Sequence, residues 1–122
     1  MILFNLVSGD NCCKRVQATY TGNQKGGAYE GQSSKFTFYT KQEGHINDKP
    51  RYVSDSGEHS IWYQGGKWRV GKIESQGSSY AGLTTKSTDD CPNEPVYDWR
   101  YYDSDDDEWY DADEGFSIWC ED

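Results

Sequence analysis

The chain has 122 residues and a formal net charge of −9, with 21 Asp and Glu residues against 12 Lys and Arg residues. A chain of this length fits one domain, over residues 1–122, with a single modest core. Its acidity argues against nucleic acid and anionic membrane surfaces as partners, because both bind clustered positive charge. It favours cations, a basic extracellular protein or a neutral polar ligand such as a glycan.

Aromatic residues dominate the expected core. Leu, Ile, Val and Phe together number only 17 residues, whereas Phe, Trp and Tyr make up 16% of the chain. Each Tyr or Trp ring buries more area than a Val side chain, so the rings offset the shortage of aliphatic residues. No apolar run is long enough to cross a membrane, and we expect no membrane insertion.

Residues 1–11 open with an apolar run that has no basic leader and is short for a full secretory signal. We interpret it as an N-terminal strand or as the remainder of a processed leader.

The chain has four cysteines, at Cys12, Cys13, Cys91 and Cys120. An even number in a small, ring-rich chain is typical of secreted, disulfide-bonded proteins. Adjacent side chains of a strand point to opposite faces, which disfavours a bond between Cys12 and Cys13. We therefore expect Cys12 and Cys13 to bond separately to Cys91 and Cys120, in either pairing. The alternative of a zinc site is disfavoured, because no Cys-x-x-Cys or Cys-x-x-His spacing occurs.

Short strands follow one another along the chain. Alternating Val16, Ala18 and Tyr20 predict a half-buried strand. The stretch 50–72 predicts three strands with two turns, since a Gly65-Gly66 pair between aromatic and β-branched runs indicates a two-residue hairpin turn. Within it, Trp68 and Val70 share a face that we expect to be inward.

The C-terminal third repeats this pattern. Tyr97, Trp99 and Tyr101 alternate on one face, and a last inward face carries Phe116, Ile118 and Cys120. No window has an apolar stripe at helical spacing. The sequence thus predicts an all-β fold, a small antiparallel sandwich or barrel-like meander stapled by disulfides, with little or no helix.

Several short motifs occur in a fixed order from Gly27 onward. They are Gly-x-Tyr (Gly27, Tyr29), Lys-Pro-x-Tyr (Lys49, Pro50, Tyr52), the pair Trp62-Tyr63, Gly-Lys-Trp-x-Val-Gly (Gly66 to Gly71), Cys-Pro (Cys91, Pro92), Trp99, Trp109 and Cys120. Their order resembles a repeat module, often in tandem, of secreted proteins from marine invertebrates and protists. The resemblance implies an extracellular, non-catalytic module. The chain departs from it in the Cys12-Cys13 pair and in its acidic run at 103–108.

The acidic run is the sharpest candidate for a metal site. Its carboxylates have the spacing of oxygen ligands in a helix-flanked calcium loop, which predicts calcium binding by Asp103, Asp105, Asp107, Asp111 and Glu114. Two features oppose an EF-hand. Glu108 stands where the loop needs Gly, and the flanks are aromatic strands rather than helices. The alternative is a solvated hairpin loop.

Aromatic rings supply a second candidate site, because exposed Trp and Tyr rings stack on sugar faces. With so few aliphatic residues, most rings must form the core. Tyr63, Tyr102 and Tyr110 are out of phase with their strands, and we expect them at the surface as ligand-binding residues.

Catalysis has little support in the sequence. We expect His45 and His59 at the surface, and neither lies near a nucleophile motif such as Gly-x-Ser-x-Gly. The leading hypothesis is a secreted, non-enzymatic binding or extracellular-matrix module, whose surface acidity suits calcium or a basic protein partner. The first alternative is a lectin-like carbohydrate-binding domain with exposed aromatic residues, and a small secreted hydrolase is a remote one.

Overall fold

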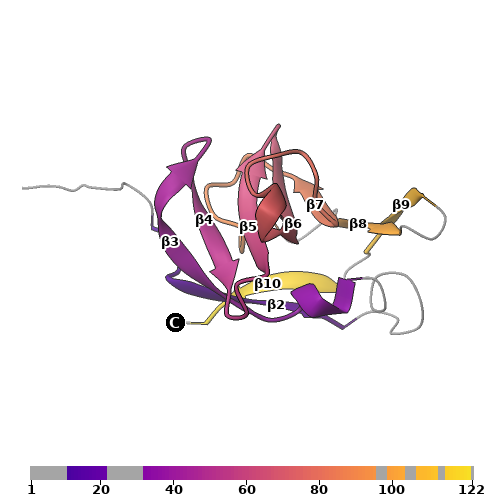
Figure 1. Ribbon diagram of the computed structural model, residues 1–122, viewed down its shortest axis with the longest axis horizontal. Helices are drawn as coiled ribbons and strands as arrows, with labels where there is room; N and C mark the ends of the chain where they lie inside the picture. Colours follow the sequence, from indigo (N-terminus) through magenta and orange to yellow (C-terminus); the bar gives the residue numbers. More distant parts are fainter. Residues whose placement is uncertain (1–10, 22–31, 96–98, 104–106, 113–114, 122) are drawn as a thin grey trace, which may run out of the picture.

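A computed structural model describes residues 11–21, 32–95, 99–103, 107–112 and 115–121 of the chain. These residues form nine antiparallel strands, which curl into an open half-barrel (Figure 1). The predicted all-β fold is therefore confirmed. The strands are β2 (Arg15–Tyr20), β3 (Phe38–Ile46), β4 (Lys49–Ser54), β5 (His59–Gln64), β6 (Lys67–Lys72), β7 (Leu83–Lys86), β8 (Arg100–Asp103), β9 (Glu108–Asp111) and β10 (Phe116–Cys120).

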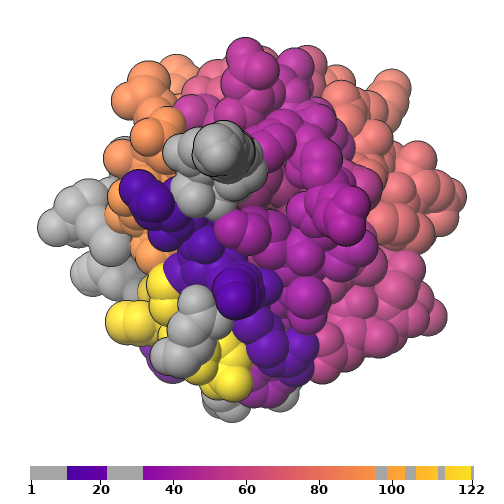
Figure 2. All heavy atoms as spheres, turned by 90° about the vertical axis from the view of Figure 1, so that its left-hand side faces the viewer, coloured from indigo at the N-terminus to yellow at the C-terminus, as the bar shows by residue number. Residues whose placement is uncertain are grey.

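The sheet follows chain order except at one edge. The strand order is β10-β2-β3-β4-β5-β6-β7-β8-β9, so the last strand pairs with β2. Figure 2 shows the indigo N-terminal and yellow C-terminal strands side by side. Two short 3-10 turns, η1 (Ser33–Lys35) and η2 (Ile73–Ser75), join strands. Within the described ranges, no helix is long and apolar enough to cross a membrane.

The predicted meander at 50–72 is confirmed as β4, β5 and β6. Gly65 and Gly66 connect β5 to β6 with φ values of 63° and 76°. Only glycine enters this left-handed region without steric cost, so the Gly-Gly pair fits a two-residue turn. The turn pairs Gln64 with Lys67 and Tyr63 with Trp68, which sets the register of the hairpin.

The concave face of the half-barrel holds a core built largely of rings. Trp68 and Trp99 are buried there, with Phe116 edge-on to Trp99 at a centroid distance of 4.8 Å. Val70 and Ile118 are also buried, as their alternation predicted. Other buried members of this core are Val16, Ala18, Tyr39, Tyr52, Ile61, Leu83 and Ala112.

The polar tips of the core rings donate hydrogen bonds to main-chain carbonyls outside the strands. The Tyr39 hydroxyl donates to the Lys35 carbonyl at 2.8 Å, and the Tyr52 hydroxyl donates to the Cys13 carbonyl at 2.6 Å. A buried hydroxyl without a partner would cost free energy, so these bonds make ring burial possible.

One connecting segment, residues 87–91, crosses one end of the half-barrel and is called the closing segment. Its carbonyls accept hydrogen bonds from the Tyr63 hydroxyl at 2.7 Å and from Trp68 Nε1 at 3.1 Å. Further along, Asp90 forms an ion pair with Lys49 of β4 at 3.1 Å. The closing segment therefore contacts three strands, β5 through Ser87, β6 through Asp89 and β4 through Asp90.

Two disulfides fix this arrangement. Cys12 bonds to Cys91 at the end of the closing segment, and Cys13 bonds to Cys120 on β10. The expected use of Cys12 and Cys13 in separate bonds is thus confirmed, and the structure resolves the pairing. The bonds close loops of 79 and 107 residues, each worth roughly 4 to 5 kcal/mol in the chain-entropy model.

The outer face of β5 and β6 is buried too, under residues 73–82. Trp62 lies on this face and donates from Nε1 to the Ser78 carbonyl at 2.8 Å. Gly71 lies opposite Ala81, where an added Cβ would come within 3.0 Å of the Ala81 Cα. Trp62 is therefore buried although it points away from the concave core.

His59 is buried, with a side chain only 6% exposed, and the expectation of a surface histidine is wrong. It is in phase with Ile61 on the concave face, at the start of β5. Burial, with the charges of Lys35 and Lys72, lowers the pKa of His59 from its ordinary value, and Glu58 opposes this only partly. Neither ring nitrogen has a hydrogen-bond partner among the described residues.

We predict that Tyr52→Phe lowers the free energy of unfolding by about 1 to 3 kcal/mol, because the Cys13 carbonyl loses its buried donor. Tyr80→Phe is the matched control, since Tyr80 is 78% exposed, and should change stability by less than about 0.5 kcal/mol. Urea unfolding of the oxidised protein measures both. Equal stabilities for the two variants would contradict the stated role of the hydroxyl.

We also predict that stability falls as the pH drops below about 6.5, the ordinary pKa of histidine. The unfolded chain binds a proton at His59 at a higher pH than the folded protein does, so the stabilising contribution of neutral His59 is present above that pH and is lost below it. Urea midpoints measured across this range should vary less in His59→Gln than in wild type. His45→Gln, at an exposed position, should behave like wild type, and a wild-type pH profile in His59→Gln would refute the assignment.

Candidate functional site

The candidate site lies on the outer face of strands β6 to β9. Thr84 of β7 pairs with Arg69 of β6 on one side and with Arg100 of β8 on the other. Lys67 and Lys86 also pair across β6 and β7. Since every second residue of a strand shares a face, these residues all project outward. We call the four cations Lys67, Arg69, Lys86 and Arg100, which surround Thr84, the basic patch.

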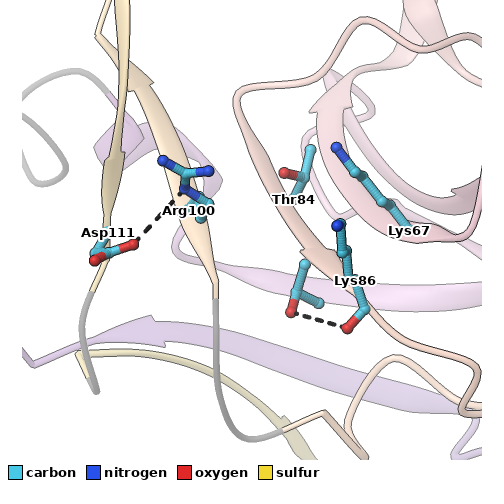
Figure 3. A pocket seen from close by; sticks show the side chains of 6 residues that line it. Lys67, Thr84, Lys86, Arg100 and Asp111 are labelled. Carbon is cyan, nitrogen blue, oxygen red and sulfur yellow. Dashed lines mark hydrogen bonds and ion pairs between the residues drawn. The ribbon is translucent and has the colours of Figure 1, made fainter.

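A cavity of about 300 Å³ is lined by Thr84 and by three cations of the patch, Lys67, Lys86 and Arg100, whereas Arg69 does not line it. Figure 3 shows Thr84 between Arg100 on one side and the two lysines on the other. Asp111 of β9 also lines the cavity, and it lies on the side of Arg100 that faces away from Thr84. The cavity is therefore mainly cationic, although the chain as a whole is acidic.

The four cations differ in how they are held. The Arg69 guanidinium is buried and donates to the Gln64 and Ser79 carbonyls at 3.0 and 2.8 Å. Burial lowers the pKa of Arg69 from its ordinary value, yet an arginine keeps its charge at neutral pH. Arg100 forms a loose, exposed ion pair with Asp111 at 3.7 Å. Within the described part of the chain, Lys67 and Lys86 form no ion pair.

An aromatic pair flanks the basic patch on the same face. Tyr102 lies two residues beyond Arg100 on β8, and it pairs with Trp109 of β9. The ring centroids are 5.5 Å apart, and Trp109 is 38% exposed. The Tyr102 hydroxyl donates to Asp107, which fixes the orientation of its ring.

The three tyrosines expected to bind ligand occupy different places. Tyr102 belongs to the aromatic pair. Tyr110 is 38% exposed and lies beside Tyr101 on the opposite face of the hairpin, at a centroid distance of 5.7 Å. Tyr63 is half-buried rather than exposed, because its register places it beside Trp68 on the concave face, with centroids 5.4 Å apart. The structure thus brings only Tyr102 next to the cavity.

The expected calcium ligands are also divided between faces. Asp103 pairs with Glu108, whereas Asp111 pairs with Arg100. Asp103 is three residues from Arg100, so Asp103 and Asp111 project from opposite faces of the hairpin. Asp107 accepts the Tyr102 hydroxyl. Asp105 and Glu114 lie outside the described residues, and among those described no three acidic, His or Cys side chains gather in a possible metal site.

Sequence reasoning missed the basic patch, because its members come from separate strands. A signal was available at one position: the Gly65-Gly66 turn fixes Lys67 on the face opposite to Trp68. The pairing of β7 with β6 and β8 spans longer connections and carries no comparable local signal. Two exposed rings, Tyr80 and Trp119, were likewise not singled out.

Comparisons of the chain with protein-family models, curated protein sequences and solved structures find no match. The resemblance to an extracellular repeat module therefore stays a prediction.

Calcium binding at 103–114 predicts a higher melting temperature in millimolar calcium than in a chelator, because a ligand that binds only the folded state stabilises it. Asp107→Asn should reduce that difference, whereas Asp48→Asn, in the β3–β4 turn, should leave it unchanged. Differential scanning calorimetry measures the shift. The same melting temperature for wild type in both buffers would reject calcium binding.

Proposed function

We propose that the protein is an extracellular, non-enzymatic module that binds carbohydrate on the outer face of strands β6 to β9. The observation that carries the proposal is the aromatic pair of half-buried Tyr102 and exposed Trp109 beside a polar cavity. This lectin-like function was an alternative in the sequence, and the placement of the rings makes it the leading one.

The chemistry of the face suits a sugar. The apolar face of a pyranose packs on an aromatic ring, while its hydroxyls need hydrogen-bond donors and acceptors in fixed positions. Trp109 offers a ring, and Thr84, Arg100 and Asp111 offer donors and acceptors at the cavity. All of them come from paired strands rather than from long loops, so the site is largely pre-formed.

The two disulfides support an extracellular location, because such bonds persist in oxidising compartments and are rare in the cytosol. They also fit a binding module of modest core size, which they stabilise by constraining the unfolded chain. A role within an extracellular matrix is compatible with the same surface.

Trp109→Ala should weaken glycan binding by about tenfold or more, since a half-exposed ring at the centre of a small site contributes at least about 1.4 kcal/mol. The matched control is Trp119→Ala, because Trp119 is 59% exposed on β10, at the other edge of the sheet. A glycan array followed by calorimetry on the hits measures both. An array without hits, or equal loss in the two variants, would reject the proposal.

A further inference from the structure

The geometry points to an acidic sugar as the ligand of this face, with its carboxylate or sulfate group seated over Thr84 within the basic patch. This inference rests on the proposed function and adds the charge class of the ligand. It is carried by the cations around Thr84 rather than by the exposed rings.

Lys67 of β6 and Lys86 of β7 bring two positive charges together on the outer face. They are direct cross-strand partners on one face, an arrangement in which like charges repel and destabilise a sheet. The chain has 21 carboxylates, yet none of the described ones pairs with either lysine. An anion placed between the two ammonium groups would convert the repulsion into attraction.

Thr84 lies among the cations of the patch. Its β-carbon lies between Arg69 and Arg100 on the neighbouring strands, and Lys86 follows two residues later on the same face. The Arg69 guanidinium is held by two carbonyls and does not line the cavity, so its fixed charge acts on an anion there through space rather than by contact. A threonine hydroxyl at the centre can donate to an oxyanion that the surrounding cations neutralise.

The basic patch and the aromatic pair lie next to each other on β8. Arg100 and Tyr102 are two residues apart on β8, which corresponds to about 7 Å along the strand. One sugar residue has this scale, so a ring over Trp109 can direct an acidic substituent, or an acidic neighbouring residue, toward Thr84. The net charge of −9 of the whole chain repels long polyanions and favours a glycan with a single acidic group.

Asp111 limits the affinity of the patch in a way that can be tested. Its carboxylate lines the cavity and lies 3.7 Å from Arg100, so it repels an incoming anion and competes for the guanidinium. Removing that charge while keeping the shape should therefore strengthen binding of an acidic ligand. Loss of the two lysines should weaken it.

The experiment uses an array of short glycans in which every uronate- or sulfate-bearing member has its neutral counterpart, and NMR titration with inorganic sulfate alone. We expect the acidic members to bind at least about tenfold more tightly than their counterparts, with weaker binding at high salt. Sulfate should shift the amide signals of Thr84 and Arg100. Equal binding of acidic and neutral members would overturn this inference and leave the proposed function standing.

Variants of the oxidised protein separate the two conclusions further. The double variant K67Q/K86Q should lose the preference for acidic members, whereas Asp111→Asn should increase the preference several-fold. Lys72→Gln is the control, because Lys72 is an exposed lysine on the concave side of β6, away from the patch. Sulfate-induced shifts without any glycan hit would reject the proposed function but support an anion-binding site at Thr84. If neither glycan hits nor sulfate-induced shifts are observed, both the proposed function and the anion-binding site are rejected.

Discussion

The fold depends on the hydrogen bonds that core rings make at their polar tips. A chain short of aliphatic residues fills its core with Tyr and Trp, and each buried ring needs an acceptor for its O–H or N–H group. The acceptors are carbonyls of the segments between strands, as for Tyr52 with Cys13 and Trp68 with Asp89. Each of these rings thereby fixes the path of a connecting segment as well as filling space, whereas Trp99 Nε1 is buried without a hydrogen-bond partner among the described residues. The need for these acceptors explains the paths of the closing segment and of residues 73–82, which cover Trp62.

Local patterns were sufficient to predict the strands and the turn between β5 and β6. Alternation placed Val70, Trp99 and Phe116 correctly in the core. Successive side chains of a strand point to opposite faces, so where only one face packs inward the apolar positions identify that face. The same rule misjudged Tyr63. Its neighbour Trp62 is buried as well, against residues 73–82, so this strand has two buried faces and its polarity pattern does not distinguish them.

The candidate site could be predicted only in part. Tyr102 was predicted to lie at the surface because it is out of phase with the inward residues of its strand. Its outward position follows from alternation with Tyr101. The basic patch needs the order of four strands, which depends on long connections and on the closing segment rather than on any short motif. His59 illustrates the same limit, because its polar neighbours in the sequence indicate a turn, while in the fold it is buried opposite Lys72 of β6.

The bond between Cys13 and Cys120 has a mechanical consequence. It joins the point where the chain enters the sheet to the point where it leaves, across 107 residues. A pulling force applied through residues 11 and 121 is carried by this covalent link, so it does not unzip the strands between them. The outer face of β6 to β9 would therefore keep its shape under such a force, because the load passes through the disulfide rather than through the strands.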